Sequence, residues 1–317
     1  MEPKLSPRNM EDLSKFRADD MFLHVEDEIT KVKDRLDPYR DHKVLILYTG
    51  GTIGMVNSEQ GYIAKKGYLH ELMRKNKYFC DEQFTAAASN SEKFLITPIT
   101  TYSKRIYYKV IEFDEIIDST NMTAAYWIQI ATAIKKHYKA FDGFIILHGT
   151  DTMAYTASAL SFMFENLSKP VILTGAQIPL SEMRNDGFQN LLGSLTIAGH
   201  FMIPEVMIFF RDKLIRGNRA SKVDNFGMEA FDSPKFPYLG NFGVTLEIDW
   251  KKIRNAPTYN SEELEVMTVS DCYFVAMILM RYIFQDIGKK IAVVKIYPLI
   301  EYTVLKGICQ DADGKIV

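Results

Sequence analysis

Two short segments place hydroxyl groups directly after apolar runs. In the first, Gly50 and Gly51 separate the run KVLILY (43–48) from Thr52. Glycines let a chain turn sharply and approach a ligand closely, so we expect the Thr52 hydroxyl to face a cleft. In the second, HGTDT (148–152) brings a second hydroxyl, Thr150, next to a carboxylate, Asp151. Hydroxyls held near a proton acceptor are the materials of nucleophilic catalysis.

Each segment also has a simpler interpretation. TGGT (49–52) could be a tight turn or a phosphate-binding turn, although a phosphate loop needs a lysine beside its Ser or Thr and none stands here. HGTDT could cap a helix. His148 and Asp151 could also bind a metal, but two ligands are too few. The residues alone leave the tight turn and the helix cap open.

A lysine completes the set of candidate catalytic groups. Lys222 ends the polar segment RGNRASK (216–222). Taken alone it is a surface lysine. Near hydroxyls and partly desolvated, it can accept a proton from a threonine, which is a poor nucleophile without such a partner.

The elements that must position these groups follow from apolar patterning. Runs rich in Val and Ile occur at 43–48, 143–149, 170–175, 205–210 and 290–298, and a more alternating run at 105–113 could be another strand. Continuous apolar runs are typical of strands buried on both faces of a parallel sheet. Helices are expected from a Thr123 cap to about Tyr138, over Thr152–Asn166 and over Asn185–Ala198. The alternation predicts an α/β fold with a doubly wound, mostly parallel sheet, with ligands at the carboxyl ends of its strands.

Composition restricts the partners. The formal net charge is −2, which favours neither nucleic acid nor an acidic membrane surface as a partner. The three cysteines are far apart, as in proteins of a reducing compartment, and the first forty residues lack the apolar run of a secretory signal. The longest apolar stretch, 273–284, is shorter than the roughly 20 residues that span a bilayer. We therefore expect a cytoplasmic protein.

Five segments together resemble a known family. They are TGGTIGM, SEQGYI (58–63), HGTDTMAYTASALSFM (148–163), ILTGAQIP (172–179) and RGNRASK. In this order and spacing the chain is similar to cytosolic, bacterial-type (type I) L-asparaginases from about His42 to about Pro234. The resemblance implies hydrolysis of the side-chain amide of L-asparagine to aspartate and ammonia. It also implies no cofactor and no metal, and a homo-oligomeric enzyme.

The resemblance also implies residue roles. Thr52 would attack the amide carbon and form an acyl-enzyme, assisted by Tyr62 from the flexible loop that follows. Thr150, aided by Lys222, would activate water or share the proton load, and Asp151 would bind the α-ammonium of the substrate.

Further residues would bind the substrate and stabilise the oxyanion. The family's DSSD segment appears here as residues 118–121, with Asn121 in place of the last Asp. Ser119 would hold the α-carboxylate with Asp118 in support. Backbone N–H groups near Thr52 and Thr150 would stabilise the oxyanion.

The resemblance predicts a division of the chain. We expect a charged extension at 1–41, the catalytic domain at 42–250, a linker with an apolar insertion at 251–290, and an incomplete second α/β domain at 291–317. In the family a full second domain completes the active site across a dimer interface. Two alternatives therefore stand beside asparagine hydrolysis. One is another amide substrate, such as glutamine or a related carrier. The other is a weakly active or inactive chain that binds or regulates a full-length asparaginase.

Overall fold

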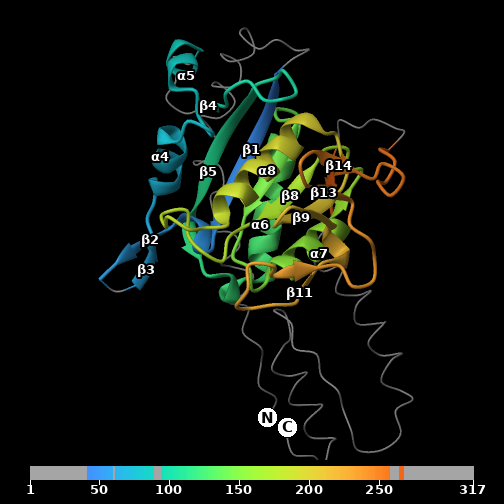
Figure 1. Ribbon diagram of the computed structural model, residues 1–317. Coiled ribbons are helices and arrows are strands. Elements are labelled where there is room, and N and C mark those ends of the chain that lie inside the picture. The colour runs from blue at the N-terminus through green and yellow to red at the C-terminus, as the bar shows by residue number, and fades with distance from the viewer. Residues whose placement is uncertain (1–40, 60, 89–93, 258–263, 268–317) are drawn as a thin grey trace, which may run out of the picture.

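The computed structural model describes residues 41–59, 61–88, 94–257 and 264–267 (Figure 1). The extension before residue 41, the apolar stretch 273–284, the strand expected at 290–298 and the predicted second domain lie outside these residues.

A nine-stranded sheet forms the centre of the described chain. Five consecutive strands of it run parallel in the spatial order β9-β8-β6-β1-β5. Their bounds are Val206–Phe210, Val171–Thr174, Gly143–Leu147, His42–Gly50 and Ile106–Ile117. The chain builds outward in both directions from between β1 and β6, so the predicted doubly wound, mostly parallel α/β sheet is confirmed.

Antiparallel strands extend this sheet at both edges. β10 (Lys213–Arg216), β13 (Gly240–Phe242) and β14 (Leu246–Ile248) continue it beyond β9, and β4 (Leu95–Ile96) lies beside β5. None of these short strands was predicted. A tight turn with positive φ at Arg211 and Asp212 joins β9 to β10.

Helices cover both faces of the sheet (Figure 1). α6 (Ala124–His137) and α7 (Met153–Met163) share one core with Leu45 and Leu47 of β1. α8 (Gly187–His200) and α4 (Tyr68–Lys75) share the other core with Val44 and Ile46. Alternate residues of β1 thus face opposite cores, which is why its sequence is continuously apolar from Val44 to Tyr48. A short helix, α5 (Glu82–Ala88), precedes β4.

The helix ends correct two predictions. α7 stops at Met163 rather than Asn166, because β7 (Phe164–Glu165) pairs with β15 (Glu265–Val266). Thr123 precedes α6 but its side chain makes no capping hydrogen bond. The N-cap residue of α8 is Asp186, and the preceding Asn185 accepts through its Oδ1 from the N–H of Phe188 at 2.9 Å in the first turn.

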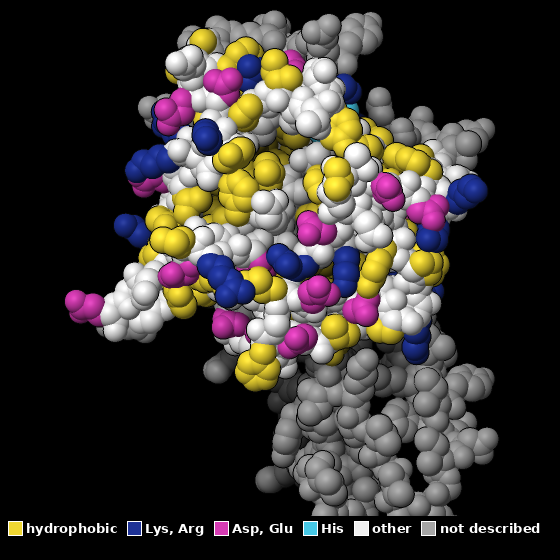
Figure 2. All heavy atoms as spheres, viewed as in Figure 1, with side chains coloured by type: hydrophobic (Ala, Val, Ile, Leu, Met, Phe, Trp, Pro, Cys, Tyr) yellow, Lys and Arg dark blue, Asp and Glu magenta, His cyan; other side chains and the backbone are white. Residues whose placement is uncertain are grey.

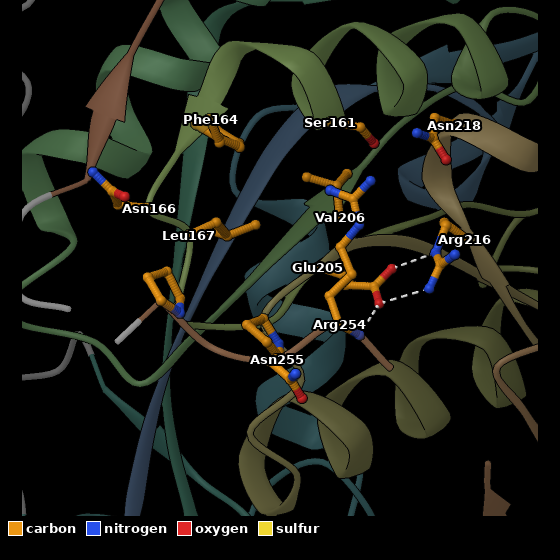
Figure 3. A pocket seen from close by; sticks show the side chains of 12 residues that line it. Ser161, Phe164, Asn166, Leu167, Glu205, Val206, Arg216, Asn218, Arg254 and Asn255 are labelled. Carbon is orange, nitrogen blue, oxygen red and sulfur yellow. Dashed lines mark hydrogen bonds and ion pairs between the residues drawn. The ribbon is translucent and has the colours of Figure 1, made fainter. Parts of the chain in front are cut away.

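The amino ends of the strands hold a pocket of about 170 Å³ beside the start of β9 (Figure 3). In its wall Glu205 accepts from Arg216 Nε at 2.6 Å and Nη2 at 3.0 Å, and from the Arg254 N–H at 2.7 Å. Segment 251–257, expected to begin a linker, thus contacts the sheet domain through Arg254. This ion pair lies at the edge of the sheet away from Thr52 and Thr150.

The visible surface carries both signs of charge. Lys and Arg side chains mingle with Asp and Glu over the face in Figure 2, as expected from the small net charge. Across the described ranges, no helix is long and apolar enough to cross a membrane.

Candidate active site

The ends of three neighbouring strands meet where the sheet order reverses. This is the place at which doubly wound sheets bind ligands. A Cβ added to Gly51, after β1, would lie 2.5 Å from the Cα and N of Gly149, after β6. A Cβ added to Gly149 would lie 2.5 Å from the Oγ of Ser119, after β5. The three turns therefore lie closer together than they could if Gly51 or Gly149 carried a side chain.

Thr52 is held at the reversal point by two unusual glycines. Gly50 and Gly51 have φ values of 141° and 86°, which side-chain-bearing residues rarely adopt. Thr52 opens the short 3-10 turn η2 (Thr52–Gly54) and is half-buried. Its hydroxyl has no hydrogen-bond partner among the described residues, so it is open to a ligand.

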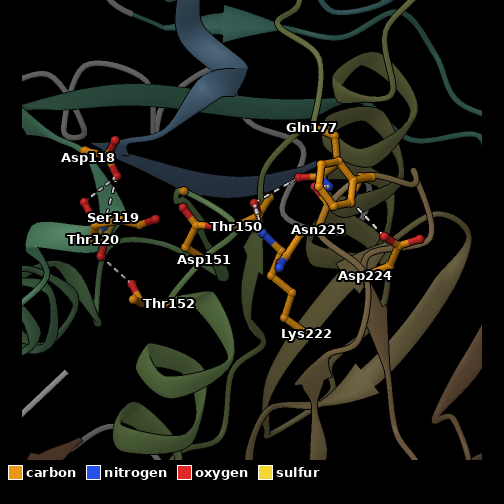
Figure 4. A network of polar contacts seen from close by, with 12 residues as sticks. Asp118, Ser119, Thr120, Thr150, Asp151, Thr152, Gln177, Lys222, Asp224 and Asn225 are labelled. Carbon is orange, nitrogen blue, oxygen red and sulfur yellow. Dashed lines mark hydrogen bonds and ion pairs between the residues drawn. The ribbon is translucent and has the colours of Figure 1, made fainter. Parts of the chain in front are cut away.

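Thr150, Asp151 and Lys222 come together after β6 (Figure 4). Lys222 Nζ donates to Asp151 Oδ1 at 2.7 Å and to Thr150 Oγ1 at 3.0 Å. The Lys222 side chain is 11% exposed, and that of Asp151 is 54% exposed. The lysine is therefore held against the hydroxyl while the carboxylate faces solvent.

Gln177 belongs to this cluster and was not singled out from the sequence. Its Oε1 accepts a hydrogen bond from Thr150 Oγ1 at 3.0 Å, and its Nε2 donates to the carbonyls of Asn225 and Gly227. The buried carboxylate of Asp186 accepts from the backbone N–H of Gln177 at 3.0 and 3.1 Å. Gln177 lies within the motif ILTGAQIP, but the pattern of apolar residues in that motif gives no indication of what the glutamine side chain contacts.

The candidate carboxylate-binding residues lie after β5. Ser119 starts the 3-10 turn η3 (Ser119–Asn121), is buried and packs against Gly149. Its carbonyl accepts from Thr152 Oγ1 at 2.7 Å. Asp118 Oδ1 accepts from the N–H and the hydroxyl of Thr120 at 2.9 and 3.0 Å. Asp118 therefore stabilises the turn that carries Ser119.

Tyr62 makes its hydrogen bond to Glu182 and none to Thr52. It lies in β3 (Gly61–Ala64), which pairs with β2 (Met55–Ser58) in a hairpin that projects from the domain (Figure 1). Its hydroxyl donates to Glu182 Oε1 at 3.0 Å, and this bond raises the pKa of Tyr62. No hydrogen bond joins Tyr62 to Thr52. The segment expected as a flexible loop is a strand pair here.

His148, considered above as a metal ligand, turns into the core. Its ring is fully buried, and burial lowers its pKa to about 4. Among the residues that the structure describes, no group of three or more His, Cys, Asp or Glu side chains is arranged to hold a metal ion.

Comparisons with known proteins agree with this site. The model of the asparaginase amino-terminal domain matches residues 43–254. The "60 kDa lysophospholipase" of Mus musculus is 45% identical over 68% of this chain and 38% of its own length. "L-asparaginase 1" of Escherichia coli K12 is 45% identical over 63% of this chain and 53% of its own length. The crystal structure of L-asparaginase I from Vibrio cholerae superposes with a TM-score of 0.61 and 36% identity, covering 84% of this chain and 68% of that one.

This chain thus spans about half or less of the curated relatives that it matches. The matched region contains β1, β6 and the turns that carry Thr52, Thr150, Asp151 and Lys222. On this evidence the chain belongs to the asparaginase family, and residues 43–254 are the amino-terminal domain of that family.

Proposed function

We propose that the chain hydrolyses the side-chain amide of L-asparagine to aspartate and ammonia. The observation that carries the proposal is the meeting of the open Thr52 hydroxyl and the Thr150–Asp151–Lys222 cluster at the carboxyl ends of β1 and β6. Relatives named L-asparaginase support the choice of substrate.

The reaction proceeds in two steps. The Thr52 oxygen forms a bond to the amide carbon, and the carbonyl oxygen becomes an oxyanion. The C–N bond then breaks, ammonia leaves with the proton that Thr52 has lost, and an acyl-enzyme ester remains. Water attacks the ester, releasing aspartate and returning the proton to Thr52.

Lys222 acts first as a hydrogen-bond donor. In its ion pair with Asp151 it is an ammonium, so it stabilises negative charge on Thr150 Oγ1 and cannot take its proton. When a substrate ammonium binds Asp151, Lys222 shares its carboxylate partner with a second cation. Binding of the substrate therefore weakens the hold of Asp151 on Lys222.

Asp151 and Ser119 bind the two charged groups of the substrate. Asp151 Oδ1 is taken by Lys222, but its side chain is half exposed and its second oxygen can accept an ammonium. Ser119 is buried beside Gly149, on the β5 side of Thr150. Tyr62 must leave Glu182 before it can assist Thr52.

The proposal is tested with the purified chain, L-asparagine and an ammonia assay. Thr52→Ala should lose more than about 100-fold of the parent rate. Thr101→Ala is the matched control and should keep the parent rate. Thr101 is exposed and lies before β5, at the amino ends of the parallel strands and away from the site. A Thr52→Ala variant with a tenth or more of the rate would contradict the nucleophile role. A folded parent that releases no ammonia would favour the binding or regulatory alternative.

A second candidate function is ester hydrolysis on lysophospholipids. The same Thr52 hydroxyl could attack an acyl ester, and one relative is named a lysophospholipase. An apolar side chain supports this candidate, since Phe226 is 100% exposed between the two residues whose carbonyls hold Gln177. Fatty-acid release from lysophosphatidylcholine, compared with ammonia release from asparagine and glutamine, distinguishes the substrates. Phe226→Ser should reduce only the lipid reaction.

We also propose a catalytic domain from residue 42 that extends past the expected boundary at 250, since Arg254 and β15 pack against it, then a linker up to 290 and the beginning of a second domain from 291. A cytoplasmic location is consistent with the free thiol of buried Cys80.

Because the matched relatives are longer, we propose that a second domain and an oligomer complete the site. Residues 1–317 should therefore be compared with a version extended by a relative's second domain. A rise in activity together with oligomer formation is expected, and equal activity would contradict the proposal.

A further inference from the structure

Three buried side chains behind the candidate site form one chain of hydrogen bonds. Trp127 Nε1 of α6 donates to Thr156 Oγ1 of α7 at 2.9 Å. Thr156 Oγ1 lies 2.9 Å from His148 Nε2, and His148 Nδ1 lies 2.7 Å from the carbonyl oxygen of Gly149. His148 and Thr156 are fully buried and Trp127 is 7% exposed. The chain thus connects two helices to the turn after β6.

The groups at the two ends of this hydrogen-bonded series determine which atom is the donor and which the acceptor in every bond. The Gly149 carbonyl can only accept, so His148 Nδ1 must carry a hydrogen. The indole of Trp127 can only donate, so Thr156 accepts from it and uses its own hydrogen toward His148 Nε2. Because burial lowers the pKa of His148 to about 4, the ring is neutral at ordinary pH and Nε2 is free to accept.

The carbonyl that His148 holds belongs to the peptide between Gly149 and Thr150. Every described peptide bond is trans, so the Thr150 N–H points opposite to the Gly149 carbonyl. The carbonyl faces the buried ring, which turns the Thr150 N–H away from the core. No hydrogen bond from this N–H to another described residue is formed.

We propose that His148 is a positioning residue, held by Thr156 and Trp127, that turns the Gly149–Thr150 peptide so that the Thr150 N–H faces the cleft as an oxyanion donor. The inference rests on the proposed amidase function. A prealigned donor contributes most when it needs no reorganisation during the reaction. His148 itself touches no substrate and exchanges no proton.

The first test is on the tautomer of the unliganded parent chain. In ¹⁵N-histidine-labelled protein, the His148 signal, assigned by its loss in His148→Asn, should show a protonated Nδ1 and an unprotonated Nε2. Thr156→Val should change this signal, whereas Thr156→Ser keeps the hydroxyl and should preserve it. A His148 ring protonated at Nε2 would overturn the inference, and this outcome does not depend on activity.

The second test measures kinetics against a matched pair in the same chain. Thr100 Oγ1 lies 2.9 Å from His200 Nε2, at the opposite edge of the sheet from the site. Thr156→Val should lower kcat for asparagine by roughly 10- to 100-fold, with KM and the Kd of aspartate within about twofold. Thr100→Val removes a Thr–His hydrogen bond of the same kind away from the site and should keep kcat.

The outcomes separate this inference from the proposed function. A parent chain that releases no ammonia would remove the proposed function, and the tautomer would still test the peptide orientation. An active parent whose Thr156→Val variant keeps kcat would overturn the positioning role. If Thr156→Val does not fold, Trp127→Phe is measured in its place. Trp127→Phe keeps the aromatic packing but loses the hydrogen bond that the indole donates to Thr156, and it should still lower kcat. An unchanged kcat would overturn the positioning role of His148.

Discussion

Replacing Gly51 with alanine tests the close contact between the turns after β1 and β6. The new Cβ would lie 2.5 Å from backbone atoms of Gly149, whereas an ordinary contact begins near 3.4 Å. Because both atoms belong to the backbone, the two turns must separate by about 0.9 Å, which is the difference between those distances. Misplacement of reacting groups by about 1 Å costs on the order of 100-fold in rate. Gly51→Ala should therefore lose about 100-fold of the asparaginase rate.

Backbone strain at residue 51 also contributes to the effect of the substitution, and a control variant measures the effect of strain separately. The φ of 86° and ψ of 170° at Gly51 cost an alanine about 1–3 kcal/mol. Gly67 also has a positive φ, 78°, but a Cβ there meets nothing within 4 Å. Gly67→Ala reports left-handed strain without a clash.

Gly149→Ala completes the comparison. Its φ is not in the left-handed range, but its Cβ would lie 2.5 Å from the Oγ of Ser119. Urea unfolding and ammonia release are measured for all three variants. We expect Gly67→Ala to lose stability while retaining most of its activity, and the other two to lose activity. A folded Gly51→Ala variant with more than a third of the parent rate, or a Gly67→Ala variant as inactive as Gly51→Ala, would refute the argument.

Four further predictions concern binding, the hairpin, stability and pH. Asp151→Asn should discriminate less than the parent against succinamic acid, which lacks the α-ammonium, and equal discrimination would exclude the ammonium-binding role. If the β2–β3 hairpin closes over the bound substrate, the amides around Tyr62 should exchange hydrogen more slowly with aspartate bound, and equal exchange would exclude such closure. Glu205→Gln leaves the Arg216 guanidinium without its carboxylate and should lower the free energy of unfolding by about 3–5 kcal/mol in urea, and a loss below about 1 kcal/mol would contradict this. The pKa of His148 is about 4 when folded and 6.5 when exposed, so the unfolded chain binds more protons between these values. The contribution of His148 to the free energy of unfolding should be complete above pH 6.5 and fall by about 3 kcal/mol as the pH drops toward 4, so the total loss of stability should be smaller in His148→Gln.

Local pattern was sufficient for the elements that flank the site. The runs are continuously apolar over 44–48 and 144–147 because α6 and α7 cover one face of the sheet and α8 the other. Such strands can be predicted from their own sequence, without knowing which strands lie beside them. The edge strands β10, β13 and β14 are only three or four residues long, and their existence depends on pairing with β9 and with one another. Pairing across a sheet leaves no periodic signal in so short a segment.

Candidate chemistry was also visible locally, since Thr52 and Thr150 stand directly after buried strands. The sequence by itself determined the α/β class, the ends of β1 and β6 and the types of reactive group placed there. Only the tertiary structure decided how those groups pair. Lys222 reaches Thr150 across 72 positions, Gln177 accepts the Thr150 hydrogen, and Glu182 accepts the Tyr62 hydrogen. Those contacts depend on the close approach of Gly51, Gly149 and Ser119, three turns from distant parts of the chain. A hydrogen bond requires donor and acceptor within about 3 Å, and sequence spacing does not specify distances between separate elements.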